Sequence, residues 1–175
     1  MPLDSETTSS EAAQKLLEKC RESALRLLDS RMHSHAELDR KLRQREFPRV
    51  LREVILTDLE RVGLVDDRMF AEAFVREKLA SSRPVGARRI LLDLRRRGIA
   101  NELAQEALAE AAEEEDGDAE LDRARQAGER KWASLMRSKR EHQKARASLY
   151  RFLASRGFDS DIIRRVIDDL PRPTD

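Results

Sequence analysis

The chain has 175 residues but only one cysteine, six glycines and five prolines, and 4% of its residues are aromatic. A single cysteine, Cys20, cannot form an intrachain disulfide, and it excludes a zinc site built from cysteines. No alternating run of β-branched and aromatic residues appears, so β-strands are not expected. No apolar run approaches membrane-spanning length, and residues 1–12 lack the features of a signal peptide. We therefore expect an all-α, soluble, cytoplasmic protein.

The motifs of enzyme chemistry are also missing. Gly-x-Gly never occurs, so no phosphate-binding glycine loop is expected. His33 and His35 are two residues apart, which does not place them on one helix face, and we expect both to be solvent-facing. His142 stands in a polar connector, and the pair Asp66-Asp67 is explained by helix capping. The sequence predicts no enzymatic activity, no metal site and no cofactor.

What is present is a core pattern that occurs three times with spacings of 4, 5, 4 and 4 residues. The four-residue steps place side chains on one helix face, and the five-residue step crosses a tight turn. Each copy therefore predicts a helix, a short turn and a second helix. The three copies are Leu38, Leu42, Phe47, Leu51 and Ile55; Ile90, Leu94, Ile99, Leu103 and Ala107; and Leu149, Leu153, Phe158, Ile162 and Val166.

Turn and cap residues support the same division. Ser34 followed by Glu37 is a capping box, and Phe47-Pro48 marks a turn. Gly98 and Gly157 fall at matching places, as do the expected caps Asn101 and Ser160. The predicted segments are a disordered tail over 1–14, repeat 1 over 15–64, repeat 2 over 65–112, an acidic linker over 113–119, repeat 3 over 120–171, and a C-terminal tail over 172–175.

The net charge of +1 conceals strong segregation of charge. Residues 102–122 include ten acidic side chains and no basic one, whereas residues 83–97 include six arginines and one acid, Asp93. Blocks of this kind indicate basic surfaces for an anionic partner, although charge-rich helices can also be merely solvated.

The arginine-rich helix is the main candidate for such a surface. At about 100° per residue, Arg88 and Arg95 nearly coincide, and Arg89 and Arg96 lie about a quarter-turn away. These four guanidinium groups are expected to face solvent and could bind phosphates, with ion pairing to neighbouring acids as the rival reading. Arg97 lies nearer the core side, and we expect it to complement the dipole of the helix C-terminus.

A second basic area is expected in repeat 3. Tyr150 is the nearest aromatic residue, so nucleic-acid contacts would be made mainly to phosphates and would be salt-sensitive. Trp132 is predicted to be a core residue. The residues of this area are Arg137, Lys139, Arg140, Lys144 and Arg146.

Several stretches together resemble the RecX family of recombination regulators. The second repeat carries the segments LVDDRMFAEAFVR from Leu64, PVGARRI from Pro84 and LRRRGI from Leu94. The first repeat carries ALRLL from Ala24 and SHAELDRKL from Ser34. The resemblance covers about residues 20–170 and is weaker in the third repeat.

The resemblance implies three tandem three-helix repeats in an elongated, curved array. It implies a monomer that binds the RecA recombinase filament on single-stranded DNA, and that most often inhibits its recombinase, ATPase and co-protease activities. DNA repair and the SOS response would be affected. The two basic areas named above would contact the filament and its DNA.

Two other readings stay open at this point. A direct DNA-binding protein with helix-turn-helix-like repeats would bind duplex DNA without a recombinase. Its reading helices would be 49–59, 102–112 and 161–169, but the second of these is acidic and enters a major groove poorly. A helical scaffold with only protein partners is the third reading.

Overall fold

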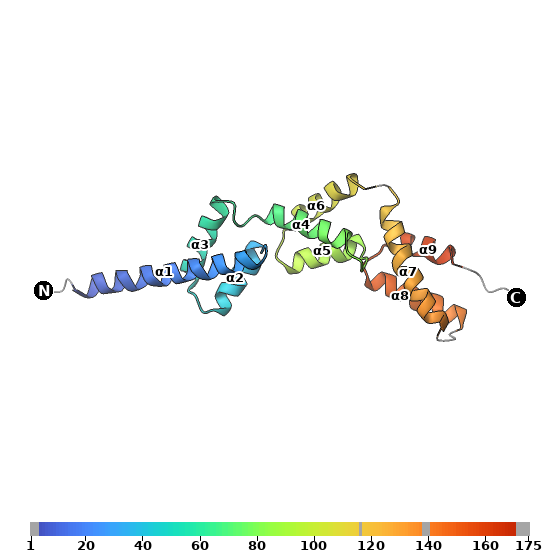
Figure 1. Ribbon diagram of the computed structural model, residues 1–175, viewed down its shortest axis with the longest axis horizontal. Helices are drawn as coiled ribbons and strands as arrows, with labels where there is room; N and C mark the ends of the chain where they lie inside the picture. Colours follow the sequence, from blue (N-terminus) through green and yellow to red (C-terminus); the bar gives the residue numbers. More distant parts are fainter. Residues whose placement is uncertain (1–3, 116, 138–140, 171–175) are drawn as a thin grey trace. The chain divides into compact units, whose positions relative to one another are not determined.

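The computed structural model describes residues 4–115, 117–137 and 141–170, and over these ranges every regular element is an α-helix (Figure 1). The prediction of an all-α tandem repeat is confirmed, because the helices form three groups of three. Repeat 1 contains α1 (Asp4–Ser30), α2 (His35–Gln44) and α3 (Arg49–Arg61); repeat 2 contains α4 (Asp67–Leu79), α5 (Ala87–Arg96) and α6 (Asn101–Glu113); repeat 3 contains α7 (Ala119–Arg137), α8 (His142–Ser155) and α9 (Ser160–Asp168).

The chain divides into two compact units. The first contains the residues up to Phe70 together with Arg97–Ile99, and the second contains Ala71–Arg96 and the residues from Ala100 onward. The first unit therefore holds repeat 1 and the turn between α5 and α6. The second unit holds repeat 3 and most of repeat 2.

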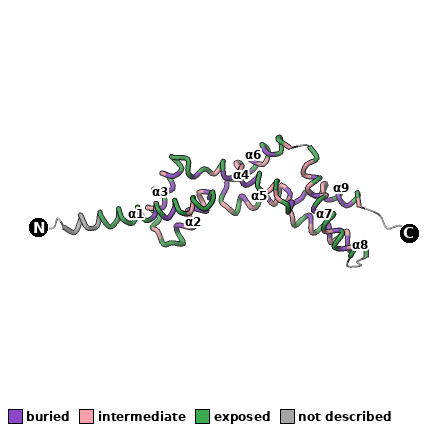
Figure 2. The backbone as a smooth tube through the Cα atoms, viewed as in Figure 1, coloured by how far each residue is buried: buried purple, intermediate pink, exposed green. Residues whose placement is uncertain are grey.

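Helices α1, α2 and α3 pack against one another in the first unit. Their core includes Cys20, Leu38 and Leu42, each fully buried (Figure 2). Helix α1 begins at Asp4, whereas residues 1–14 were expected to form a disordered tail. No glycine or proline interrupts Asp4–Ser30, which favours a continuous helix. Residues 11–14 of this helix are nevertheless exposed.

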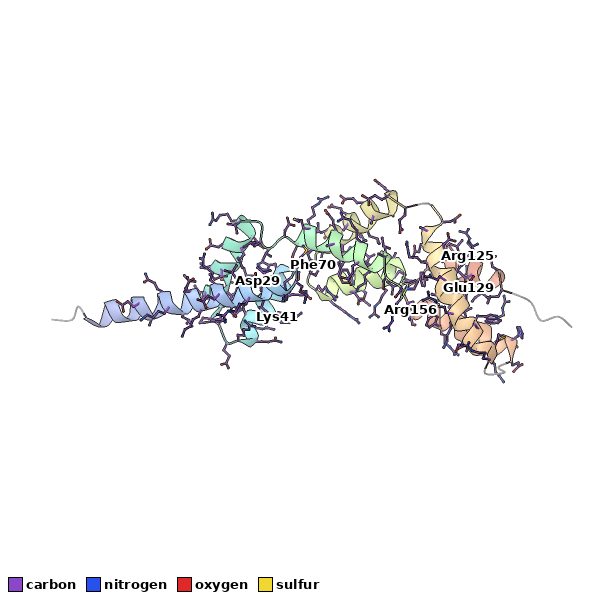
Figure 3. The ribbon with its side chains drawn as sticks, in the orientation of Figure 1. Asp29, Lys41, Phe70, Arg125, Glu129 and Arg156 are labelled. Carbon is purple, nitrogen blue, oxygen red and sulfur yellow. The ribbon has the colours of Figure 1, made fainter. Side chains whose placement is uncertain are left out.

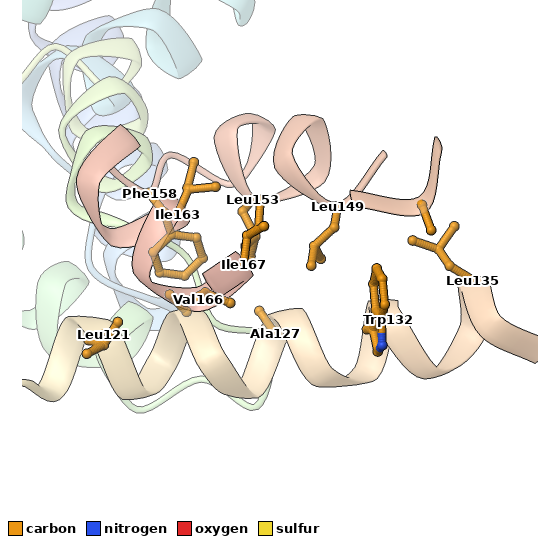
Figure 4. Close-up of a cluster of buried hydrophobic side chains, with 12 residues drawn as sticks. Leu121, Ala127, Trp132, Leu135, Leu149, Leu153, Phe158, Ile163, Val166 and Ile167 are labelled. Atoms are coloured by element: carbon orange, nitrogen blue, oxygen red, sulfur yellow. The ribbon is translucent and has the colours of Figure 1, made fainter. Parts of the chain in front are cut away.

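Repeat 3 has the larger core cluster, formed where α7, α8 and α9 pack together. Side chains of α7, among them Ala127 and Trp132, point toward Leu149, Leu153 and Val166 (Figure 4). Trp132 is 9% exposed, which confirms it as a core residue.

The repeated core pattern is confirmed. Eleven of its fifteen residues are buried and four are half-buried, and none is exposed. The half-buried residues are Phe47, Leu51, Leu103 and Ile162. Three of these, Leu51, Leu103 and Ile162, occupy the same place in their repeats, so the three copies bury the same face.

The turns also match between repeats. Gly98 and Gly157 have φ values of +83° and +85°, and Glu46 occupies the equivalent position with φ +63°. The expected caps are one residue off: α6 and α9 follow Ala100 and Asp159, and the Asp159 carboxylate accepts the N–H of Asp161 at 3.1 Å. Only Asp159 makes a side-chain cap bond there, because its short carboxylate reaches the second amide of the helix.

In the first unit, the start of α2 is bonded to two later segments. The Ser34 hydroxyl donates to the carbonyl of Arg97 at 2.6 Å, and the His35 N–H donates to the Asp67 carboxylate at 2.8 Å. The backbone of Gly98 lies so close to α2 that a Cβ on Gly98 would be 2.2 Å from the Cβ of Ala36. These contacts hold the turn that follows α5 against the beginning of α2.

The second unit repeats this arrangement one repeat later. The Gly86 N–H donates to the carbonyl of Arg156 at 3.0 Å, and the Ala87 N–H donates to the Glu120 carboxylate at 3.0 Å. A Cβ on Gly157 would lie 2.4 Å from the backbone nitrogen of Arg89. In the three-fold pattern Gly86 is equivalent to Ser34, and Arg156 is equivalent to Arg97. The start of α5 is therefore fixed on the turn between α8 and α9.

Candidate nucleic-acid interface

Helix α5 separates its four arginines, of which Arg89 is half-buried and the other three are exposed, into two pairs. Arg89 and Arg96 both contact the carboxylate of Asp93, with N–O distances of 2.9 and 3.6 Å. Arg88 makes no side-chain hydrogen bond or ion pair with any residue in the described part of the chain. Arg95 donates to the amide oxygen of Asn101 at 3.2 Å, which leaves its charge unneutralised. The ion-pairing alternative thus applies to two of the four arginines.

Arg88 and Arg95 border a groove within the second unit. Its volume is about 510 Å³, and it lies between α5 and the α8–α9 part of repeat 3. Leu92 and Tyr150 also line it, and each is 38% exposed. The groove brings together the arginine helix and the aromatic residue that the sequence placed nearest to the second basic area.

The groove is held by the contacts at the start of α5. Arg156, labelled in Figure 3, donates to the carbonyl of Pro84 at 3.1 Å, and Arg130 donates to the carbonyl of Ser82 at 2.8 Å. The N–H of Arg88 itself bonds the carbonyl of Gly157 at 3.3 Å. Several hydrogen bonds thus join the loop before α5 to repeat 3, and they fix the position of the helix that carries Arg88 and Arg95.

Arg97 has a partner outside its own helix. Helix α5 ends at Arg96, and the Arg97 Nε lies 3.6 Å from the carboxylate of Glu37 in the first unit. Glu37 is 5% exposed and also binds Arg31 at 2.9 Å. Arg97 therefore pairs with a buried carboxylate, a contact that its place at the end of α5 did not indicate. Glu37 completes only half of the expected capping box, in which its N–H donates to the Ser34 hydroxyl at 3.1 Å.

The structure describes three of the five residues of the second basic area. Lys144 pairs with Glu141 at 2.9 Å, and Arg146 pairs with Asp168 at 3.4 Å. These two residues are two positions apart on α8, so they point to different sides. Arg137 is exposed at the end of α7. Lys139 and Arg140 lie outside the described residues.

The histidines and the cysteine occupy structural positions. His33 is 3% exposed, which corrects the expectation that it faces solvent, and its Nδ1 lies 3.0 Å from the carbonyl of Arg31. Burial lowers the pKa of His33. His142 begins α8 and packs edge-on against Trp132. Cys20 is fully buried, and this burial raises the pKa of its thiol.

The acidic segment between α6 and α7 is attached to repeat 3. Glu115 pairs with Arg123, and Asp118 pairs with Arg165 at 3.2 Å. Glu120, one residue into α7, accepts the N–H of Ala87. Sequence reasoning missed this role of Glu120, since only tertiary packing brings it to the start of α5.

The described residues form neither a metal site nor a membrane-spanning helix. Across residues 11–115, 117–137 and 141–170, no three histidine, cysteine or acidic side chains gather in a way that could hold a metal ion. None of the helices formed by those residues is long and apolar enough to cross a membrane.

Comparison with known proteins matches each repeat separately. Models of the first, second and third three-helix domains of RecX match residues 20–59, 66–108 and 118–167, in that order. A regulatory protein RecX from Chlorobium phaeobacteroides strain BS1 is 37% identical over 150 residues, which cover 85% of this chain and 91% of the relative. The chain belongs to the RecX family.

Two solved RecX structures have the same fold. A crystal structure of RecX from Lactobacillus salivarius has a TM-score of 0.74 at 23% identity, covering 90% of this chain and 97% of its own. A second crystal structure of a regulatory protein RecX has a TM-score of 0.82 at 20% identity, covering 97% of this chain and 81% of its own. The resemblance predicted from the first two repeats is confirmed, and it extends to the third repeat, where the sequence signal was weaker.

Proposed function

We propose that this chain binds the RecA filament on single-stranded DNA and restrains its recombinase, ATPase and co-protease activities. The observation that carries the proposal is the ordered match of all three repeats to a family of regulatory proteins. Through these activities the protein would affect DNA repair and the SOS response. It would act in the cytoplasm as a monomer, by steric and electrostatic means, without making or breaking a bond.

The charged helices of the second unit support this proposal. Arg88 and Arg95 offer unneutralised guanidinium groups for DNA phosphates, which arginine binds through paired N–H donors. Helix α6 contains Glu102, Glu106 and Glu110 at helical spacing and has no basic residue, so it suits a basic protein surface. Separate weak contacts from one chain would combine as avidity on a repeating filament.

The same helices argue against a protein that reads duplex DNA with its third helices. Helix α6 would have to enter the major groove with the exposed carboxylates of Glu102 and Glu106, which phosphates on both sides would repel. A direct duplex-binding function is therefore an outcome of the test below.

The test is the rate of ATP hydrolysis by RecA on single-stranded DNA, with the full chain titrated well below the recombinase concentration. We expect a fall in rate at substoichiometric amounts and co-sedimentation with the filament. Unchanged hydrolysis without co-sedimentation would refute the proposal, and tight duplex binding without the recombinase would favour the direct DNA binder.

Two double variants that remove equal charge sharpen this test. Arg88→Gln with Arg95→Gln removes the unneutralised pair, whereas Arg89→Gln with Arg96→Gln removes the pair already bound to Asp93. We expect the first variant to weaken inhibition more, and to reduce its salt dependence more, than the second. Equal losses would mean that only net charge matters.

A further inference from the structure

The groove beside α5 combines two surfaces that are chemically different. One wall carries the guanidinium groups of Arg88 and Arg95, and Leu92 lies between them on the same helix face. The opposite wall carries Tyr150 from α8, and Phe158, which is 1% exposed, belongs to the lining. A volume of about 510 Å³ lies within the range of sites that take small molecules, roughly 300–1,000 Å³.

The charge of the groove is of one sign. Among the residues that the structure describes, its lining includes Arg88, Arg89 and Arg95 and no aspartate or glutamate. Asp93 neutralises Arg89 from the next turn of α5, at 2.9 Å. The remaining two arginines face the groove without a carboxylate partner among the described residues. The groove therefore suits an anionic group that also has an apolar face.

The groove is also preorganised. The backbone N–H groups of Gly86 and Arg88 donate to the carbonyls of Arg156 and Gly157. These bonds fix the start of α5, which carries the arginines, to the turn between α8 and α9. A Cβ on Gly86 would lie 2.4 Å from the carbonyl oxygen of Gly157, so the two backbones are in direct contact. A site whose walls are already in place loses little freedom when a ligand binds.

We propose that this groove binds a nucleotide of single-stranded DNA, with the phosphate between Arg88 and Arg95 and the base against the ring of Tyr150. This assignment rests on the proposed function and gives its basic surface a ligand. Duplex DNA does not fit the same role, because its bases are stacked inside and offer no face to a tyrosine ring. The groove thus favours the unpaired strand.

The test measures binding of the full chain, without any recombinase, to three fluorescent oligonucleotides of equal length by anisotropy. They are oligothymidylate, an abasic strand with the same phosphates, and a duplex. Stacking of one base on an aromatic residue contributes about 1–3 kcal/mol, so Tyr150→Ala should weaken oligothymidylate binding about fivefold or more. The same variant should leave abasic-strand binding unchanged, and Tyr150→Phe should bind like the parent chain.

The charge arm uses a matched control in the first unit. Arg88→Gln with Arg95→Gln should weaken both single strands, whereas Arg40→Gln with Arg43→Gln, which removes the same charge from the exposed side of α2, should change little. Circular dichroism melting of each variant verifies that it is folded. Tyr150 and both pairs of arginines are outside the buried core, so folding should persist.

The outcomes separate the two proposals. Equal oligothymidylate affinity for Tyr150→Ala and the parent chain would overturn the base-binding assignment, as would preferential binding of the duplex or no saturable binding at all. Displacement of oligothymidylate by a polyglutamate peptide of equal charge and equal affinity would also overturn it, because the groove would then bind anions of any kind. In each case RecA ATP hydrolysis still decides the proposed function independently.

Discussion

Replacing Gly157 by alanine should destabilise the second unit by more than the cost of placing an alanine at a positive φ. Gly157 has φ +85°, a conformation that costs an alanine about 1–2 kcal/mol. Alanine also reduces the conformational freedom of the unfolded chain, which lowers the net destabilisation by about 0.4–1 kcal/mol. The new Cβ would also lie 2.4 Å from the Arg89 nitrogen and 2.6 Å from its Cβ. Overpacking of this kind adds about 1–3 kcal/mol, so a total of about 1–5 kcal/mol, centred near 3, is expected.

Two other glycines separate these contributions. Gly63 has φ +73° with no atom within 4 Å of an added Cβ, so Gly63→Ala carries the backbone cost alone, about 1 kcal/mol. Gly117 has neither a positive φ nor a close neighbour, so Gly117→Ala should be nearly neutral in the same unit as Gly157. Gly63→Ala thus measures the cost of backbone strain, and Gly157→Ala measures that cost together with the close contact. Gly117→Ala measures the effect of an alanine where neither applies.

The assay is urea unfolding followed by far-ultraviolet circular dichroism and by tryptophan fluorescence. Trp132 is the only tryptophan, and it lies in the core of repeat 3, so its emission reports on the unit that holds Gly157. Gly63→Ala is followed by circular dichroism, because Gly63 belongs to the first unit. If Gly157→Ala cost no more than Gly63→Ala, the close contact with Arg89 would not contribute to stability, and the account of how α5 is fixed would be wrong.

Further substitutions test other parts of the structure by the same unfolding measurements. Glu46→Gly should be neutral or stabilising by up to about 1 kcal/mol, because Glu46 is exposed and occupies the left-handed position that glycine adopts without strain; a clear loss would contradict this. Leu94→Asp should cost about 4 kcal/mol or more, since Leu94 is fully buried and the carboxylate would find no partner there. A folded Leu94→Asp chain with parental stability would exclude that reading. For His33, burial lowers the folded pKa below the ordinary 6.5, so the unfolded chain takes up protons first and stability falls as the pH drops below 6.5. His33→Gln should show a smaller loss between pH 8 and pH 5, and an identical profile would remove His33 as the source.

The sequence predicts the local features of this protein well. Hydrophobic spacing identifies buried residues such as Leu38, Leu94 and Leu149, because the period of a helix is fixed by its geometry. The glycines that end α5 and α8 are equally readable, since few other residues adopt a positive φ.

The ion pairing of two α5 arginines with Asp93 could have been predicted from the sequence. Arg89 and Asp93 are four residues apart, and Asp93 and Arg96 are three apart, which are the spacings at which helical side chains meet. Those spacings divide the four arginines into a pair that contacts Asp93 and a pair that does not. The groove itself was not predictable, since its second wall comes from Tyr150, more than fifty residues later in the chain.

Burial of His33 and the role of Glu120 depend on tertiary contacts and leave no local pattern. A histidine directly before the N-cap serine of a helix has the same sequence signature whether another segment covers it or not. Glu120 would be read as an acid in the first turn of α7, where it also favours the helix dipole. Its bond to Ala87 arises only because α7 packs beside the loop before α5.

The differences between the repeats follow from these contacts. Gly98 and Gly157 meet two requirements, a positive φ and space for a neighbouring helix start, and only glycine satisfies both. Glu46 meets only the first requirement, because its side chain is exposed, so a larger residue is tolerated at some cost in strain. In the second unit the glycine contact determines where α5 begins, and through it the positions of Arg88 and Arg95 at the groove. Gly157 of repeat 3 therefore helps to position the arginines of repeat 2 at the groove, through backbone packing against the start of α5.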